Sequence, residues 1–181
     1  MHPRLEQLME YAAIQRTGLL AAVAGVPESL QGRRPSPHAW SVTEVLEHLQ
    51  IVEAGVARLI SRRLERARAD GLGPETETGS VLRSLDRFAL TEPRNSIPAP
   101  DFVRPKGALT AAAAPAALAE SRRALRQALT GGDGLALGKV SAPHVLLGPL
   151  TLYEWVLFVG QHESRHTIQI GEIARQLKSA P

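Results

Sequence analysis

Two histidines, His162 and His166, lie four residues apart in a C-terminal stretch with helical periodicity. On an α-helix such residues are separated by one turn and about 40° of rotation, so both imidazoles point the same way. The same face carries an apolar stripe: Trp155, Phe158, Val159, Ile170, Ile173 and Leu177. We therefore expect both rings to face the core, where an imidazole loses hydration unless it finds a partner. A shared divalent cation would satisfy both.

A third histidine, His48, stands far upstream, next to Leu49 and four residues before Val52 on the inner side of another predicted helix. Three converging imidazoles are enough to hold a divalent metal, and they leave coordination positions open, which is typical of catalytic rather than structural sites. We expect zinc or nickel, with iron, manganese or copper as alternatives, because imidazole suits several metals. The competing interpretation is a core histidine bonded to a carbonyl or an acid.

The string His-Glu-x-x-His also matches the zinc-protease signature. A protease would need a third ligand downstream, but no histidine follows His166, and Glu172 falls on a different face of the helix. The protease interpretation is therefore rejected. Glu163 stays as a weak catalytic candidate near the rim of the site, as an acid behind the ligands or a general base on a metal-bound water. A surface glutamate is the equally open alternative.

The remaining histidines are His2, His38 and His144. His38 and His144 fall in predicted loops near helix starts, where either could line a pocket mouth, but we interpret them as solvated. The chain has no cysteine, which excludes disulfides, thiolate metal sites and cysteine nucleophiles. Any metal must then be held by His, Asp or Glu.

Four predicted helices position these residues. The helix that carries His48 starts with a capping box of Ser41 and Glu44, and the last helix starts with a second box of Thr151 and Glu154. The expected ranges are Pro3–Ala24, Ser41 to about Ala69, Pro115–Leu129, and Thr151 to about Lys178. A long, proline-rich connection from residue 71 to 110 has one short helical possibility, Ser80–Leu90, and residues 138–150 form a second loop. No segment alternates at period two, so we predict no sheet and one all-α domain over residues 1–181, a four-helix bundle with a long crossover.

Composition limits the location of the protein and the kinds of partner that we expect. The 181 residues carry a net charge of +3, and no apolar run approaches the roughly 20 residues that span a bilayer. The N-terminus does not resemble a secretory signal, so we expect a cytoplasmic protein with no membrane partner. Arginines gather at residues 58–68 and 122–126, and we interpret both clusters as solvated helix faces rather than a nucleic-acid surface.

Two segments resemble the signatures of the DinB-like (YfiT-like) metal-binding superfamily. The first is Trp40–Leu49 (WSVTEVLEHL), and the second is Gly148–Trp155 (GPLTLYEW), followed by His162-x-x-x-His166 and then Gln169–Ile170. The resemblance covers the whole chain in order. It implies an up-down-down-up four-helix bundle, often dimeric, with a three-histidine metal site near one end. The ligands correspond to His48, His162 and His166.

The resemblance also suggests activities. Characterised members of the family include S-transferases that use low-molecular-weight bacterial thiols and a mycothiol-dependent maleylpyruvate isomerase, while many members have no assigned activity. We therefore expect a metal-dependent enzyme, of S-transferase or hydrolase type, that activates a thiol or water against a small-molecule substrate. Arg94 and Arg104 in the long connection could hold a carboxylate of the thiol. The alternative is a non-enzymatic helical module that binds a metal or a stress ligand.

Overall fold

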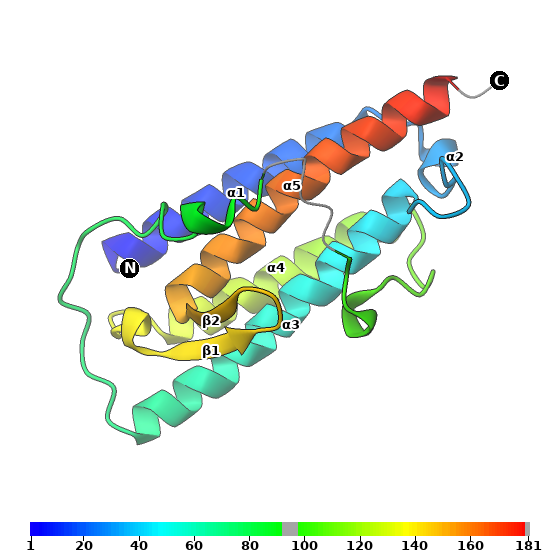
Figure 1. Ribbon diagram of the computed structural model, residues 1–181. Helices are drawn as coiled ribbons and strands as arrows, with labels where there is room; N and C mark the ends of the chain where they lie inside the picture. Colours follow the sequence, from blue (N-terminus) through cyan, green and yellow to red (C-terminus); the bar gives the residue numbers. More distant parts are fainter. Residues whose placement is uncertain (92–97, 180–181) are drawn as a thin grey trace.

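A computed structural model describes residues 1–91 and 98–179, and in this part of the chain four long helices form a bundle (Figure 1). The long helices are α1 (Pro3–Ala24), α3 (Val42–Ala69), α4 (Ala114–Gly131) and α5 (Leu152–Ser179). The shorter elements are α2 (Glu28–Gln31), η1 (Asp86–Phe88), η2 (Asp101–Val103), η3 (Leu137–Lys139), β1 (Ser141–His144) and β2 (Gly148–Thr151). None of the helices described is long and apolar enough to cross a membrane.

The helices run up, down, down and up in chain order (Figure 1). Helix α1 packs along α5, α3 packs along α4, and α3 also contacts α5. Because α3 and α4 are parallel, the chain must return along the length of the bundle between them, and the long connection does this. The predicted all-α bundle with a long crossover is therefore confirmed.

Both predicted capping boxes are present at the starts of the histidine-bearing helices. The Ser41 hydroxyl accepts the Glu44 amide N–H at 3.2 Å, and the Glu44 carboxylate accepts the Ser41 N–H at 2.8 Å. At α5 the Thr151 hydroxyl accepts the Glu154 N–H at 3.2 Å, and the Glu154 carboxylate accepts the Thr151 N–H at 2.9 Å. These boxes fix where each of the two helices begins.

The prediction of no sheet is wrong. Strands β1 and β2 form an antiparallel hairpin immediately before α5, with Ser141 opposite Thr151 and His144 opposite Gly148. Each strand has only four residues and contains a proline, so no alternation of apolar and polar residues was visible. The short helix expected over residues 80–90 is also reduced, to turns and the single 3-10 element η1.

The apolar core is divided into two clusters along the bundle. One cluster contains Leu5 and Leu8 of α1 and the first residues of α5, and the other contains Leu19 of α1 and the stretch from Ile170 of α5. Between them, the middle turns of α1, α3, α4 and α5 contribute buried polar residues: Arg16, Glu53, Ser121, Gln161, Glu163 and His166. The predicted chemistry of the chain is concentrated in this layer.

Candidate metal centre

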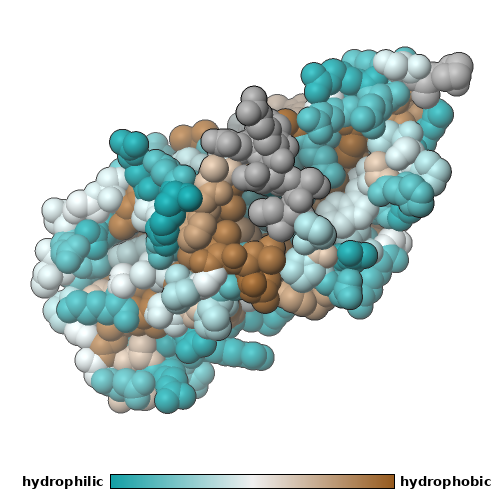
Figure 2. Space-filling model, in the orientation of Figure 1, coloured by the Kyte–Doolittle hydropathy of each residue, from teal (hydrophilic) through white to brown (hydrophobic). Residues whose placement is uncertain are grey.

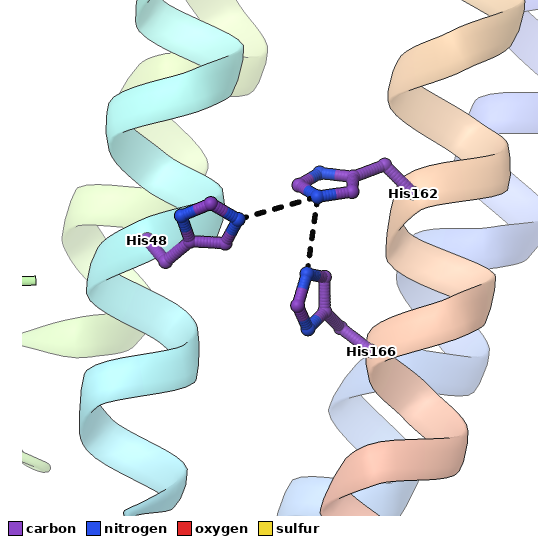
Figure 3. A group of neighbouring side chains, drawn as sticks. All are labelled: His48, His162 and His166. Atoms are coloured by element: carbon purple, nitrogen blue, oxygen red, sulfur yellow. Dashed lines mark hydrogen bonds between the residues drawn. The ribbon is translucent and has the colours of Figure 1, made fainter. Parts of the chain in front are cut away.

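Three imidazole rings converge between α3 and α5 (Figure 3). His48 comes from α3, and His162 and His166 come from successive turns of α5. The Nε2 atom of His162 lies 3.2 Å from Nε2 of His48 and 3.0 Å from Nε2 of His166. One ring nitrogen from each histidine lies within 4.8 Å of the other two. The structure thus brings together the three residues that the sequence selects as ligands.

The hydrogen-bond partners of the Nδ1 atoms show which ring nitrogen carries the proton in His48 and His166. Nδ1 of His48 lies 2.7 Å from the carbonyl oxygen of Val103, and Nδ1 of His166 lies 2.6 Å from the Oε1 atom of Gln169. Both oxygens only accept hydrogen bonds, so both Nδ1 atoms carry the proton. Nε2 of His48 and Nε2 of His166 therefore each present a lone pair toward Nε2 of His162. Hydrogen bonds to the outer nitrogen orient histidine ligands of metals in the same way.

The spacing suits a transition-metal cation. Zinc–nitrogen bonds of about 2.0–2.1 Å in a tetrahedral site separate ligand nitrogens by about 3.3 Å, close to the two separations in the structure. Without a cation, two lone pairs would compete for the one proton that Nε2 of His162 can carry. With a cation, all three nitrogens are satisfied. The donor set therefore fits a divalent metal.

Burial keeps the rings neutral. It lowers the pKa of His48, against the opposing effect of the Val103 carbonyl. Burial, followed by the neighbouring rings of His166 and His48, lowers the pKa of His162 well below its ordinary value. Burial also lowers the pKa of His166 to about 3. Neutral imidazole is the form that binds metals.

These shifts predict how the stability of the metal-free protein depends on pH. Because the pKa of His166 falls from 6.5 to about 3 on folding, the unfolded chain takes up a proton first as the pH is lowered. Stability is then lost progressively between pH 6.5 and pH 3. From pH 7 to pH 5 we expect His166 alone to cost about 2 kcal/mol.

Urea unfolding followed by circular dichroism at the two pH values measures this loss. The His166→Gln variant should lose about 2 kcal/mol less than the wild type between pH 7 and pH 5. An identical loss in the variant would contradict a strongly lowered pKa in the folded state. The His38→Gln variant, changed at an exposed turn, is the control.

Aromatic rings pack against two of the three histidines. The Phe158 ring stacks on His162 with centroids 5.2 Å apart and planes 16° apart. His144 lies edge-on to Phe158 at 4.7 Å, and Trp40 lies 5.1 Å from His48. The prediction that His144 is solvated in a loop is therefore wrong: it belongs to β1 and is half-buried, and burial lowers its pKa. No pattern in the sequence predicted the hairpin, so the burial of His144 could not be predicted either.

The other two histidines lie outside the cluster. His38 is exposed in a turn, as predicted. His2 is the N-cap of α1, where its ring accepts the amide N–H of Arg4 at 3.4 Å. Within the described residues, the three-histidine group is the only cluster of His, Asp and Glu donors suited to a metal.

A buried carboxylate holds the loop that orients His48. Glu47 accepts the backbone N–H groups of Lys106, Gly107 and Ala108 at 3.0–3.3 Å. The adjacent His48 donates to Val103 in the same loop, so two consecutive residues of α3 fasten it. Sequence reasoning missed this role, because an acid beside a ligand gives no sign of the distant amides that it binds.

We expect the Glu47→Ala variant to bind metal about 10 to 100 times more weakly, since loss of the hydrogen bond that orients a histidine ligand typically costs roughly this factor, and Glu47 holds the loop that makes this bond. The variant leaves three amides without their acceptor and frees the Val103 carbonyl to move away from His48. Competition with a chromophoric chelator measures the affinity. The matched control is Glu65→Ala, on an exposed position of the same helix. Equal affinities in the two variants would show that the loop does not orient the ligand.

Glu163 does not lie at the surface or at the rim of the site. Its side chain is 2% exposed, and its Oε1 atom accepts hydrogen bonds from Arg16 at 2.8 Å and from Arg122 at 2.9 Å. Burial raises its pKa, while the two guanidinium groups oppose the rise. The structure thus assigns this carboxylate to an ion cluster inside the bundle, and we do not propose it as a general base.

The same cluster corrects the prediction of a solvated helix face for Arg122, whereas Arg123 and Arg126 of α4 are exposed, as predicted. Arg122 is half-buried and also bonds Glu53, which in turn accepts hydrogen bonds from Arg16 and Ser121. The cluster therefore joins α1, α3, α4 and α5 with two cations and two anions.

A groove of ≈ 590 Å³ between α1 and α4 borders Arg16 and Arg122, but no histidine lines it. The arginines at residues 58–68 are exposed, as predicted.

The two arginines suggested for a thiol carboxylate gain no support. Arg104 is exposed, pairs with Asp101 at 3.2 Å and donates to the Ala99 carbonyl. Arg94 lies outside the described residues.

Comparisons with known proteins agree with this architecture. The family model of the DinB superfamily matches residues 12–170. The chain is 26% identical over 156 residues to the uncharacterised protein YuaE of Bacillus subtilis (strain 168), covering 86% of this chain and 90% of that protein. It also superposes on the crystal structure of TT2238, a four-helix bundle protein, with a TM-score of 0.55, 19% identity, and coverage of 91% of this chain and 95% of the other.

Proposed function

Because this chain belongs to the DinB superfamily, we propose that it binds one divalent cation through Nε2 of His48, His162 and His166 and acts on a small molecule there. The observation that carries the proposal is the orientation of the outer nitrogens. Val103 and Gln169 accept the Nδ1 protons of His48 and His166, which leaves the Nε2 lone pairs of these two rings directed at Nε2 of His162.

Three neutral protein ligands would leave coordination positions of the cation open for a water or a thiol. A divalent cation bound in such a site favours the deprotonated form of a water or a thiol at neutral pH. The chain itself contributes orientation and shielding: Phe158 stacks on one ligand ring, and Trp40 lies beside another. We propose zinc or nickel as the cation and an S-transferase or hydrolase reaction, with a low-molecular-weight thiol or water as the nucleophile. A homodimer and a cytoplasmic location remain predictions.

Metal analysis of the full chain tests the first half of the proposal. The protein is stripped with chelator, dialysed against zinc or nickel, and analysed by mass spectrometry of the native complex. We expect one ion per chain. Failure to retain either ion would overturn the site.

Cobalt(II) substitution tests the second half, because cobalt reports its ligands by visible absorption. We expect a thiolate-to-cobalt band when a low-molecular-weight thiol is added, and faster conjugation of an electrophile by the metal-loaded than by the metal-free protein. Metal binding without a thiolate band, thiol conjugation or hydrolysis would favour the alternative, a non-enzymatic metal-binding module.

A further inference from the structure

Large exposed apolar side chains stand on the two segments that support the metal ligands. Phe102, 68% exposed, directly precedes Val103, whose carbonyl holds His48. Val145 and Leu146, 65% and 53% exposed, directly follow His144, whose ring lies against the Phe158 ring that stacks on His162. Each segment is thus connected to a ligand through one contact or two.

The two segments lie on the same face of the bundle. Element η2, which contains Phe102, packs on α3, and strand β2 of the hairpin packs on α5 (Figure 1). Figure 2 shows hydrophobic surface over the hairpin. The segment of Phe102 contacts His48 through Val103, and the segment of Val145 and Leu146 reaches His162 through His144 and Phe158. Exposed apolar residues therefore stand next to the support of one metal ligand on each of the two helices. We call Phe102, Val145 and Leu146 the apolar rim.

The loop of the hairpin has three residues, and all three are apolar: Val145, Leu146 and Leu147. Gly148, at φ 76°, supplies the left-handed residue that follows a loop of this length. The His144 ring fixes the turn, because its Nδ1 atom accepts the N–H groups of Leu146 and Leu147 at 3.2 Å. Leu147 packs on the core, while the other two point outward. Two apolar side chains are thus held outward in a fixed turn, next to the histidine that contacts Phe158.

The size of the rim decides what it binds. Three side chains expose at most a few hundred Å², whereas a stable protein interface buries at least about 1,000 Å² in total. The rim is therefore too small for a second copy of the chain by itself, and it matches the body of a small molecule.

Resting on the proposed function, we propose that the apolar rim binds the hydrocarbon part of the ligand whose donor atom reaches the metal. The substrate class is then a small thiol or oxygen-donor molecule with an apolar body, rather than a highly charged one. The rim residues determine specificity and take no part in holding the metal.

A series of linear alkyl hydroxamates, from two to eight carbons, tests this on the cobalt-loaded full chain. Hydroxamates chelate cobalt through two oxygens, so visible absorption reports their binding. We expect affinity to rise about 4-fold for each methylene that the rim buries. The variants Phe102→Ser and Val145→Ser/Leu146→Ser should flatten this rise and leave the affinity for the two-carbon compound and the cobalt content unchanged.

The matched control is Ile14→Ser, which removes an exposed apolar side chain from α1, and it should keep the full rise. Affinity that does not depend on chain length, or a rise that survives in the rim variants, would overturn the inference and leave the proposed metal site standing. Dimers that dissociate only in the rim variants, measured by sedimentation, would show that a second copy covers the rim and would also overturn it. Failure of cobalt to bind would overturn the proposed function and this inference together.

Discussion

The His162→Ala variant is expected to lose metal binding almost completely. Its Nε2 atom is the nitrogen closest to both other ligands, 3.2 Å from that of His48 and 3.0 Å from that of His166. Without it, two imidazoles on different helices remain. Loss of a group that only orients a histidine ligand already weakens metal binding by up to roughly 100-fold, so loss of the ligand itself should exceed that factor. Isothermal titration with zinc measures the change.

Thermal unfolding gives an independent measurement. A cation that binds only the folded state stabilises it in proportion to the logarithm of its concentration over Kd. Excess zinc should therefore raise the melting temperature of the wild type and of a His38→Ala control, but not that of His162→Ala. Retention of one ion per chain with wild-type affinity in His162→Ala would remove this residue from the ligand set.

The Arg122→Met variant is expected to lose a large part of its folding stability. The Arg122 side chain is 14% exposed and donates to Glu53, to Glu163 and to the Ala12 carbonyl. Its removal leaves two buried carboxylates with a single guanidinium, that of Arg16. Breaking a buried ion pair in this way costs about 3–5 kcal/mol, because the remaining charge is left uncompensated.

The neighbouring Arg123 supplies a matched control. It is 73% exposed and pairs only with Glu120 among the described residues, so Arg123→Met should change stability by less than about 0.5 kcal/mol. Urea unfolding of the metal-free proteins, followed by circular dichroism, compares the two. Similar losses in both variants would show that the buried cluster contributes no more than a surface pair.

Local signals explain what the sequence could predict. The boxes formed by Ser41 with Glu44 and by Thr151 with Glu154 depend on residues three apart, and they located both histidine-bearing helices. The pair His162 and His166 lies on one face by helix geometry alone. Together with the inward position of His48, these regularities were enough to predict the bundle and the convergence of its three imidazoles.

The unpredicted features depend on distant partners. Arg16 and Glu163 are 147 residues apart, and their contact depends on how the long helices are rotated against one another. In a sequence, each looks like an ordinary surface charge. The amides that Glu47 binds lie about 60 residues downstream, in a connection without periodicity. The hairpin was not predicted because its strands are too short to show an alternation of apolar and polar residues.

The positions of the two tryptophans have a practical consequence. The chain has only Trp40 and Trp155, and the first lies 5.1 Å from His48 while the second lies 5.2 Å from His144. Tryptophan fluorescence of this protein therefore arises from one ring that contacts a proposed ligand and from a second ring that contacts the aromatic side chains beside the cluster. A paramagnetic ion such as copper(II) or nickel(II) bound to the three histidines would quench this emission, whereas closed-shell zinc would leave most of it. Tryptophan emission of the unlabelled chain would thus distinguish a paramagnetic ion from zinc at the proposed site.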